Sequence, residues 1–410
     1  MSEIRVKVSD MAHGGDAVAR HEGKVIFVPY AAPGEELLVE LTEEKATYAR
    51  ARLLEVVSAS PQRVEPRCPH FGTCGGCQWQ HIAYDTQLTL REEILRTQFR
   101  RVGQLSAISM KPSLRAANPW RYRNHVQLHL DETGRLGFMA AKGRRVIPIR
   151  ECPIMHPLVA DVFAALDVDF PELEQVSIRA APTTGQQLLV LETRGDTAPA
   201  LEIDMPASCV LLLEDGTPVT YVGDSYITEN LADGSFRVSA ASFFQVNTAQ
   251  AEQLLETVRR HLDPQGDEVL LDVYCGVGTF GLTVAGSVRK VIGIEESTAA
   301  AADARFNSQD TPNVQIVHGR AEELVPDLEE KIDLVILDPP RRGCHADVLA
   351  ALPKLGPTKI IYVSCDPATL ARDVRRLVQS GYQLTEVQPV DMFPQTCHVE
   401  AVSLLRPTVS

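Results

Sequence analysis

The spacing of hydrophobic and polar positions divides the chain into two differently built parts. From about residue 3 to residue 58, short segments alternate apolar and polar side chains, which is the period of a half-buried β-strand. The predicted strands cover residues 4–8, 24–28, 36–41 and 49–57. Turn residues separate them, including His13-Gly14-Gly15-Asp16. Four or five short strands in succession predict a small barrel of the oligonucleotide-binding (OB) type.

From about residue 236 onward, buried-strand runs alternate with segments of helical spacing. The runs cover residues 269–273, 290–294, 334–337, 360–364 and 399–405. Strands that alternate with helices indicate a doubly wound α/β domain with a Rossmann-like sheet. The predicted fold class is therefore α/β plus all-β.

The middle of the chain is less regular. Residues 58–67 are polar with two prolines and read as a linker, residues 84–102 have helical spacing, and residues 121–231 are rich in strands and loops. We therefore predict three domains: an OB-like barrel over 1–58, a β-rich central domain over 59–235 and the α/β domain over 236–410. The sequence leaves open whether the helix at 84–102 packs on the central or the C-terminal domain.

Composition narrows the class of protein. The hydrophobic content of 44% and charged content of 23% are those of a soluble globular chain. No apolar run approaches the roughly 20 residues that span a bilayer, and residues 1–10 contain no apolar signal core. We expect a cytoplasmic protein, a monomer without a membrane partner. The net charge is −14, yet residues 87–150 carry 13 Lys and Arg against 4 Asp and Glu, which leaves room for a local face that binds phosphates.

A glycine-rich turn follows the strand at 269–273. Gly276, Gly278 and Gly281 allow a tight turn and a close approach of the backbone to a ligand at a helix N-terminus. Glu295 ends the next strand, where a carboxylate can accept hydrogen bonds from ribose hydroxyls, and Glu296 is its rival. This spacing suits both a dinucleotide and S-adenosylmethionine (SAM).

The turn after the strand at 334–337 separates these two cofactors. Asp338, Pro339 and Pro340 lie where ligands bind in open α/β sheets, at the carboxyl edge. An Asp-Pro-Pro turn at this position resembles the motif of methyltransferases that act on nucleobases. It favours SAM over a nicotinamide cofactor.

Cys365 is the candidate nucleophile. It lies between the buried strand at 360–364 and a helix that begins with the N-cap Asp366 and Pro367. Amide dipoles at a helix N-terminus favour thiolate over thiol, so we expect an activated cysteine. A general base is offered by Glu400 or His398, which strand alternation places on one side, with Cys397 pointing the other way into packing.

A second group of cysteines lies near residue 70. Cys68, Cys74 and Cys77 provide three thiols from one glycine-rich loop. A structural zinc would take His70 or His81 as its fourth ligand. An iron–sulfur cluster would take a fourth thiolate, for which Cys152 is the candidate, and the cysteine-only set favours this alternative.

Together these residues closely resemble the RNA 5-methyluridine methyltransferase family over nearly the whole chain. The N-terminal strands look like the TRAM domain of that family, and residues 243–247 match its segment before the first methyltransferase helix. The resemblance implies SAM contacts from Gln245, Tyr274, Glu295 and Asp338, with Gly276 and Gly278 in the turn. It also implies that Cys365 is the nucleophile, Glu400 the base, and Cys68, Cys74, Cys77 and Cys152 the ligands of a [4Fe–4S] cluster.

The activity implied is SAM-dependent methylation of uridine C5. C5 of uracil is a weak nucleophile until a thiolate adds to C6, and the intermediate must then lose its C5 proton to a base. The TRAM domain and the cysteine cluster resemble the bacterial branch that modifies 23S ribosomal RNA, and a transfer-RNA branch has a similar layout.

The RNA partner would have to present an unstacked uridine. Guanidinium and aromatic groups that suit stacking and phosphate contact interleave in Arg115, Trp120, Arg121, Tyr122 and Arg123. Two other classes remain: a non-catalytic RNA-binding iron–sulfur protein of ribosome assembly, and a non-covalent methyltransferase acting on a base nitrogen, which would not need Cys365.

Overall fold

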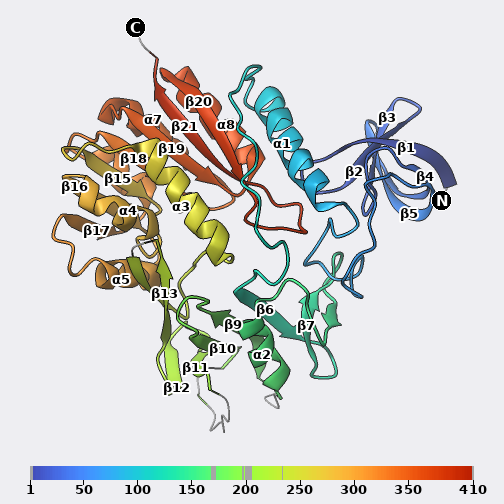
Figure 1. Cartoon of the computed structure of the whole chain (residues 1–410), viewed down its shortest axis with the longest axis horizontal. Coiled ribbons are helices and arrows are strands. Elements are labelled where there is room, and N and C mark those ends of the chain that lie inside the picture. Colours follow the sequence, from blue (N-terminus) through green and yellow to red (C-terminus); the bar gives the residue numbers. More distant parts are fainter. Residues whose placement is uncertain (1–2, 168–171, 196–197, 199–205, 233, 409–410) are drawn as a thin grey trace.

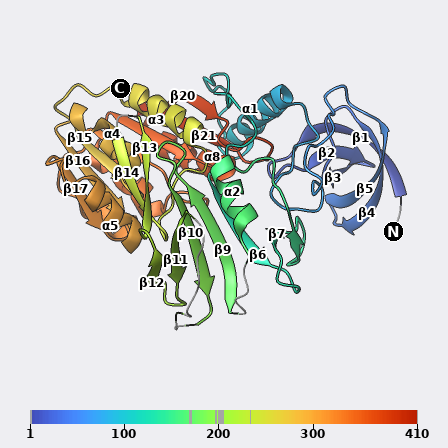
Figure 2. The ribbon, with the colours of Figure 1, turned by 60° about the horizontal axis from the view of Figure 1, so that its bottom comes forward.

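The computed structural model describes residues 3–167, 172–195, 198, 206–232 and 234–408. An N-terminal barrel, a central, mostly antiparallel sheet and a C-terminal α/β sheet form three parts (Figures 1 and 2). The predicted fold class is confirmed. Among the described helices, none combines the length and the apolar character needed to cross a membrane.

Five strands close the N-terminal barrel in the order β1-β2-β3-β5-β4. They are β1 (Glu3–Met11), β2 (Ala17–His21), β3 (Lys24–Val28), β4 (Glu36–Glu44) and β5 (Tyr48–Ser58). Alternate positions such as Val6, Val8, Ile26 and Val28 are buried, which is the pattern read from the sequence. The parallel pairing of β3 with β5 closes the barrel, so that no sheet edge is left open.

A seven-stranded sheet with the order β12-β11-β10-β9-β6-β7-β8 forms the central part. Its strands are β6 (His125–Leu130), β7 (Leu136–Met139), β8 (Val146–Pro148), β9 (Leu173–Ala180), β10 (Gln187–Thr193), β11 (Ser208–Leu212) and β12 (Pro218–Val222). Helix α2 (Pro157–Ala165) buries Val159 and Val162 against it. A hairpin of β13 (Tyr226–Leu231) and β14 (Gly234–Ser239) follows and leads to the C-terminal part.

The C-terminal sheet has the order β17-β16-β15-β18-β19-β21-β20. Its strands are β15 (Val269–Val273), β16 (Lys290–Glu295), β17 (Val314–His318), β18 (Leu334–Leu337), β19 (Lys359–Ser364), β20 (Tyr382–Val390) and β21 (Glu400–Pro407). The first five are parallel, and β21 runs antiparallel between β19 and β20. Every strand run predicted here is confirmed, whereas β17 and β20 carry too many polar residues to be recognised as buried strands.

Helices cover both faces of this sheet, as the doubly wound reading requires. They are α3 (Thr248–Leu262), α4 (Thr279–Val284), α5 (Thr298–Asn307), α6 (Ala321–Leu324), α7 (Ala346–Leu355) and α8 (Pro367–Gln379), with short 3-10 turns η1 (Ala285–Ser287) and η2 (Val325–Asp327). Helices α3, α4 and α5 share one apolar core with the sheet, and α7 and α8 share the other. The two cores leave the carboxyl ends of the parallel strands free for a site.

Helix α1 (Tyr84–Arg101) packs on α8, at the side of the C-terminal sheet that faces the barrel (Figure 1). Its residues Leu90, Ile94 and Phe99 join the same core as α8. The chain then runs beside β20, with bridges from Met110 to Val387 and from Leu114 to Val390. The question that the sequence left open is therefore answered in favour of the C-terminal sheet.

Candidate active site

The carboxyl edge of the C-terminal sheet brings the predicted site residues together. Three of them follow directly after parallel strands, one ends a strand, and one begins the antiparallel strand at the same edge. They are Tyr274 after β15, Asp338 after β18, Cys365 after β19, Glu295 at the end of β16 and Glu400 at the start of β21. Residues from five strands therefore meet at one place.

The glycine-rich turn after β15 is held by Glu295. One carboxylate oxygen, Oε2, accepts a hydrogen bond from the backbone N–H of Gly276 at 2.9 Å, and Oε1 accepts one from the N–H of Ser297 at 2.7 Å. Glu296 instead has a 51% exposed side chain, 3.8 Å from Arg342. The geometry thus favours Glu295 over its neighbour as the carboxylate of this turn.

The backbone of the turn has a conformation that glycine adopts readily. Gly276 has a φ of +57° and Gly278 one of +89°, and Tyr274 enters the turn with a φ of +65°. A Cβ atom at Gly276 would meet no atom within 4 Å, so the turn borders open space. The Tyr274 hydroxyl accepts a hydrogen bond from the N–H of His345 at 3.4 Å, which places this hydroxyl at the start of α7.

Three acids lie close together beneath this turn. Burial raises the pKa of Asp338 to about 7, and the charges of Asp272 and Glu295 add to this. Burial also raises the pKa of Asp272 to about 7, although the N–H of Gly281 donates to it at 2.8 Å. The arrangement concentrates negative charge at one edge of the sheet and suits a cationic ligand.

Cys365 and Glu400 are neighbours across two strands. In the antiparallel pairing of β19 with β21, Ser364 is opposite Ala401, so the next residue of each strand end, Cys365 and Glu400, also face each other. Glu400 is 4% exposed. Its burial, followed by the charge of Asp338, raises its pKa well above the usual range.

The thiol of Cys365 is surrounded by acids. Burial, followed by the charges of Glu400 and Asp338, raises its pKa to about 12, while Arg341 opposes this shift. The predicted helix start is present, because Asp366 caps α8 by accepting hydrogen bonds from the N–H groups of Ala368 and Thr369. The activated thiol expected from this helix start stays a prediction.

His398 lies outside the last strand, which begins at Glu400. Strand alternation therefore does not apply to residue 398, and the prediction that residues 398 and 400 share one side stays a prediction. Its ring lies 5.7 Å from that of Phe393 at 71°, and burial lowers its pKa to about 4. Cys397 packs against Gly15 of the barrel, in line with the packing role expected for it.

Gln245 lies in the segment between β14 and α3, half-buried, and its carbonyl accepts a hydrogen bond from Asn124 at 3.2 Å. Two residues earlier, Phe243 is 69% exposed, an unusual state for a large aromatic ring. The hydrophobic pattern does not reveal this exposure, because Phe244 next to it is buried.

The four cysteines of the second group border one pocket of about 260 Å³, together with Thr396 and His398. They are Cys68, Cys74, Cys77 and Cys152. Burial raises the pKa of Cys77 to about 12, and the other three thiols contribute to the shift. Within the described part of the chain, no three or more His, Cys, Asp or Glu side chains are arranged so as to hold a metal ion. This finding supports neither the zinc nor the iron–sulfur alternative, and His70, the candidate zinc ligand, also borders the pocket.

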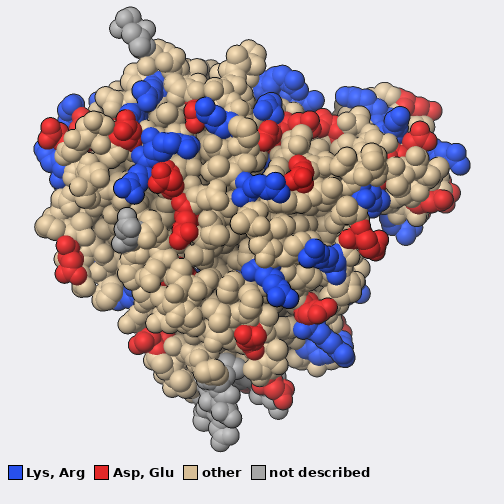
Figure 3. All heavy atoms as spheres, viewed as in Figure 1, with Lys and Arg blue, Asp and Glu red and all other residues tan. Residues whose placement is uncertain are grey.

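The stretch of arginines and aromatic rings has mixed roles. Tyr122 is buried and donates a hydrogen bond to the carbonyl of Pro394 at 2.9 Å, so its expected role in base stacking is wrong. Trp120 is half-buried beneath Arg67, whose guanidinium is 4.7 Å from the ring centroid. Arg121 is exposed. On the face drawn in Figure 3, Lys and Arg are interspersed with Asp and Glu and form no continuous basic patch.

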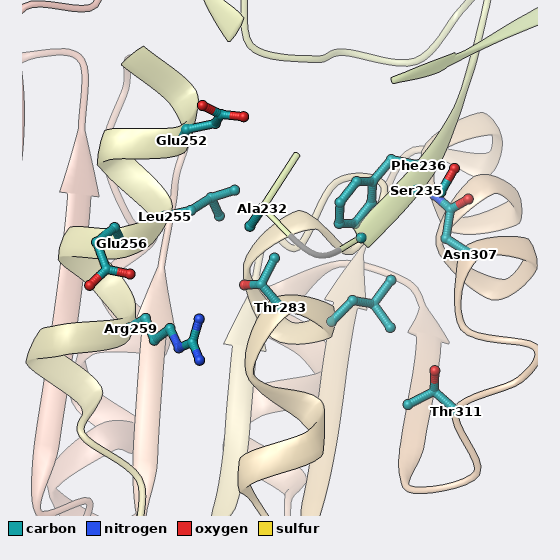
Figure 4. Close-up of a pocket in the computed structure, with 12 residues that line it drawn as sticks. Ala232, Ser235, Phe236, Glu252, Leu255, Glu256, Arg259, Thr283, Asn307 and Thr311 are labelled. Atoms are coloured by element: carbon teal, nitrogen blue, oxygen red, sulfur yellow. The ribbon is translucent and has the colours of Figure 1, made fainter. Parts of the chain in front are cut away.

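Another hollow of about 260 Å³ lies between α3, α4 and the β13–β14 hairpin (Figure 4). Its polar side chains include Glu252, Glu256 and Arg259 on α3 and Thr283 on α4. It contains none of the predicted site residues and no nucleophile, so we assign the chemistry to the sheet edge.

Two groups at the sheet edge were not predicted as site residues. Asp272 is an acid within an otherwise apolar buried run, which was the signal available in the sequence. Arg341 follows Asp338-Pro339-Pro340 and lowers the pKa of the thiol of Cys365. The sequence shows that residue 341 is an arginine, but it does not show that its side chain lies near Cys365.

The fold and the sheet edge define a Rossmann-like methyltransferase joined to an OB-like barrel. The profile of the family described as tRNA (Uracil-5-)-methyltransferase matches residues 220–408, and that of the TRAM domain matches residues 1–54. An uncharacterized RNA methyltransferase of Thermosynechococcus vestitus is 38% identical over 98% of this chain and 97% of its own. Another uncharacterized RNA methyltransferase, of Streptomyces avermitilis, is 35% identical, and the match covers 99% of this chain and 98% of that protein.

Among solved structures, the Pyrococcus abyssi tRNA (uracil-54, C5)-methyltransferase in complex with S-adenosyl-L-homocysteine matches with a TM-score of 0.77. It is 27% identical, and the match covers 98% of this chain and 100% of that one. The chain belongs to the RNA uracil-5-methyltransferase family and contains a TRAM domain. The family and this neighbour support SAM as the cofactor.

Proposed function

We propose that this protein methylates C5 of a uridine in RNA, with Cys365 as the covalent nucleophile and Glu400 as the general base. The observation that carries the proposal is the register of β19 and β21, which sets these two side chains opposite each other beside Asp338. A non-covalent methyltransferase would have no use for a thiol at this position.

The sheet edge fits SAM in shape and charge. A Cβ at Gly276 would meet open space, and the buried Oδ1 atom of Asp272 has no hydrogen-bond partner within the described residues. Beyond burial, the charge of Glu295 raises the pKa of Asp272 and of Asp338, and the charge of Asp272 raises that of Asp338, which favours a cation among these acids. We propose that the cofactor is held by Gln245, Tyr274, Gly276, Gly278, Glu295 and Asp338.

The bound cofactor supplies an electrophilic methyl group on a sulfonium cation. The residues of this chain prepare the acceptor: the thiolate of Cys365 adds to C6 of uracil, and the electron pair of the C5–C6 double bond becomes available at C5. After methylation Glu400 takes the C5 proton, the electron pair of that C–H bond restores the double bond, and the sulfur–C6 bond breaks.

RNA presentation involves surfaces around this edge. A uridine must leave its stack before C5 and C6 can reach Cys365. The exposed ring of Phe243 lies two residues before Gln245 and offers a flat apolar surface for a base, since stacking on aromatic side chains is sequence-tolerant. Exposed arginines such as Arg121 provide charge for the backbone.

We propose 23S ribosomal RNA as the target, on the basis of the TRAM domain combined with the second cysteine group. A tRNA uridine is the second candidate, favoured by the P. abyssi neighbour, whose substrate is tRNA. We keep a cytoplasmic location and a monomeric state as predictions.

We further propose a structural [4Fe–4S] cluster on Cys68, Cys74, Cys77 and Cys152. Four thiols from two separate segments border one pocket, together with His70 and His398, and no described carboxylate is among the residues that line it. Four iron ions and their sulfides occupy more space than one zinc ion, so the ligands of a cluster stand farther apart than those of a single metal. Methyl transfer needs no electron, so the cluster would hold the loop in place.

The test incubates the purified protein with labelled SAM and either transfer RNA or fragments of 23S RNA, followed by nucleoside mass spectrometry. We expect 5-methyluridine from one RNA class. The variant Glu400→Gln should accumulate a protein–RNA adduct that survives denaturing gels, because the C5 proton cannot leave. A product methylated on nitrogen, or RNA binding without any product, would select one of the other two classes of protein.

A further inference from the structure

The turn between β1 and β2 of the barrel, residues 12–16, lies against the proposed active site. The turn is closed by hydrogen bonds from the N–H of Ala12 to the carbonyl of Asp16 at 2.8 Å and from the N–H of Gly15 to the carbonyl of Ala12 at 3.0 Å. This turn belongs to the N-terminal barrel and lies more than 250 residues before the first strand of the methyltransferase sheet in the sequence. Two of its residues touch the segments that carry Cys365 and Glu400.

The first contact joins His13 to Asp366. The Nε2 atom of His13 lies 3.3 Å from Oδ2 of Asp366, and the two side chains are 35% and 23% exposed. Partial burial raises the pKa of Asp366, but His13 and the hydrogen bonds from Thr369 outweigh this and hold it at about 2. Asp366 is therefore a full carboxylate with a fixed partner in the barrel.

The two oxygens of Asp366 have separate partners. Oδ1 accepts hydrogen bonds from the N–H groups of Ala368 at 3.0 Å and Thr369 at 2.8 Å, which cap α8, and Oδ2 faces His13. The N–H of Asp366 donates to the hydroxyl of Ser364 at 3.1 Å. Cys365, between Ser364 and Asp366, is thus flanked by two residues with fixed positions.

The second contact joins Gly15 to Cys397, three residues before Glu400. A Cβ at Gly15 would lie 2.6 Å from the Cβ of Cys397, and the indole N–H of Trp79 donates to the carbonyl of Gly15 at 3.1 Å. The residue has a φ of +91°, so both its conformation and the space around it require glycine. The same turn therefore supports the segments of the nucleophile and of the base.

We propose that His13 is a positioning residue of the methyltransferase, which orients Asp366 and with it the Cys365 loop when the barrel is docked. The inference rests on the proposed roles of Cys365 and Glu400. The barrel thereby acts on the catalytic step directly, in addition to any contact it makes with RNA. Gly15 keeps the turn close enough for this contact.

The first test replaces His13 in the full-length protein. His13→Ala should lower kcat about 10-fold and leave the KM for RNA within about 2-fold. His13→Gln keeps an N–H of similar reach and should restore kcat to within about 3-fold of the wild type. His21→Ala is the matched control, because this other barrel histidine is similarly exposed, at 37%, and its recorded ion pair is with Glu22 at 4.0 Å.

The second test uses the two adjacent glycines. Gly14 and Gly15 both have positive φ, +98° and +91°, but a Cβ at Gly14 would meet no atom within 4 Å. Gly14→Ala therefore reports backbone strain alone, and Gly15→Ala adds the displacement of Cys397. We expect kcat to be about 10-fold lower in Gly15→Ala than in Gly14→Ala.

A third measurement needs neither RNA nor activity. The rate at which iodoacetamide alkylates Cys365, followed by peptide mass spectrometry, should fall about 3-fold in His13→Ala, because the carboxylate of Asp366, no longer held by His13, can turn toward the thiol, whose pKa its charge raises. If the wild type produces no 5-methyluridine but this rate still falls, the proposed function fails, while the effect of His13 on the Cys365 loop is upheld.

Three results would overturn the positioning role while methylation stands. One is a His13→Ala protein with wild-type kcat and alkylation rate. Another is a rise in KM for RNA without a change in kcat, which would make the turn an RNA contact. The third is a Gln variant as slow as the Ala variant, since that would remove the role of the N–H donor.

Discussion

Two groups of cysteines in this protein have opposite surroundings. Cys365 is a single thiol whose pKa is set by burial, by Glu400 and by Asp338, with Arg341 nearby. The four cysteines of the second group surround one pocket, and the shift of Cys77 comes from burial and from the other three thiols. In both environments burial is the largest cause of the shift, and it raises the pKa of Cys365 and of Cys77 to about 12.

The difference lies in what can lower these pKa values. A cation placed among the carboxylates would stabilise the thiolate of Cys365 for a single attack. A cationic iron–sulfur core would stabilise all four thiolates of the second group at once and remain bound. The groups around a cysteine therefore decide whether it serves as a nucleophile or as a metal ligand.

The two environments are joined by the loop before β21. Thr396 and His398 border the cysteine pocket, and the loop continues directly into Glu400. Arg91 of α1 donates to the carbonyls of Thr396 at 2.7 Å and His398 at 3.1 Å and fixes this loop. A change in the cysteine pocket should therefore shift the position of Glu400 through this loop. The variants below distinguish such indirect effects on catalysis from direct ones.

The largest effect is expected for Cys365→Ser. A hydroxyl is a far weaker nucleophile than a thiolate, so methyl transfer should fall by about 10⁴-fold or more, with SAM affinity within about 2-fold. Single-turnover assays with labelled SAM and equilibrium binding measure the two quantities. The control Cys209→Ala alters a cysteine that is fully buried in β11 of the central sheet and should stay active. Full activity of Cys365→Ser would remove the covalent mechanism.

The second expected effect is the loss of iron from Cys77→Ala. One missing thiolate of four should abolish the ultraviolet–visible absorption and the iron and sulfide content of anaerobically purified protein, and lower the Tm by about 10 °C. The decrease in kcat should stay well below that of Cys365→Ser, because the effect reaches Glu400 only through the loop. Zinc in place of iron in the wild type would contradict the cluster.

The third effect compares two adjacent acids. Glu295→Gln removes a charged acceptor at the glycine turn and should weaken SAM binding by about 2 kcal/mol, about 30-fold in Kd. Glu296→Gln alters a side chain that is 51% exposed and should leave Kd within about 2-fold. Isothermal titration calorimetry with SAM measures both. Equal losses would show that Glu295 has no special role.

The smallest effect concerns the charge of the cofactor. At about pH 8, far below a thiol pKa of about 12, the alkylation rate of Cys365 is proportional to its thiolate fraction. SAM carries a sulfonium charge that S-adenosyl-L-homocysteine lacks, so SAM should lower the pKa by about one unit more, giving about a 10-fold faster rate. Identical rates with the two ligands would show that the cofactor does not activate the thiol.

Local patterns predicted much of this fold correctly. The runs at 269–273 and 334–337 are strands with those bounds, and the helix at 84–102 ends one residue earlier. The position of Cys365 between β19 and the start of α8 was also visible, because the N-cap Asp366 and Pro367 are local signals. Such features depend on residues within one or two turns of each other.

Relations across long stretches of chain were not visible in the same way. Alternation could not choose between His398 and Glu400, because in a strand it puts both residues on one side, and the start of β21 at Glu400 was not visible in the sequence. It predicted an activated thiol from the helix start, whereas the acids that surround Cys365 come from β18 and β21. His13 was part of a turn signal, and its contact with Asp366 depends on the docking of the barrel.

The sequence by itself determined the elements and the chemistry they carry: a small barrel of four or five strands, a Rossmann-like sheet, a thiol before a helix, a glycine turn and a cysteine-rich loop. Periodicity, caps and glycines act over a few residues, so they can be read from the chain. Tertiary structure alone decided which side chains face each other, namely Cys365 with Glu400, His13 with Asp366 and α1 with α8. Strand register and domain docking depend on the packing of segments that are distant in the sequence. The pKa of the Cys365 thiol depends on which charged residues these segments bring close to it.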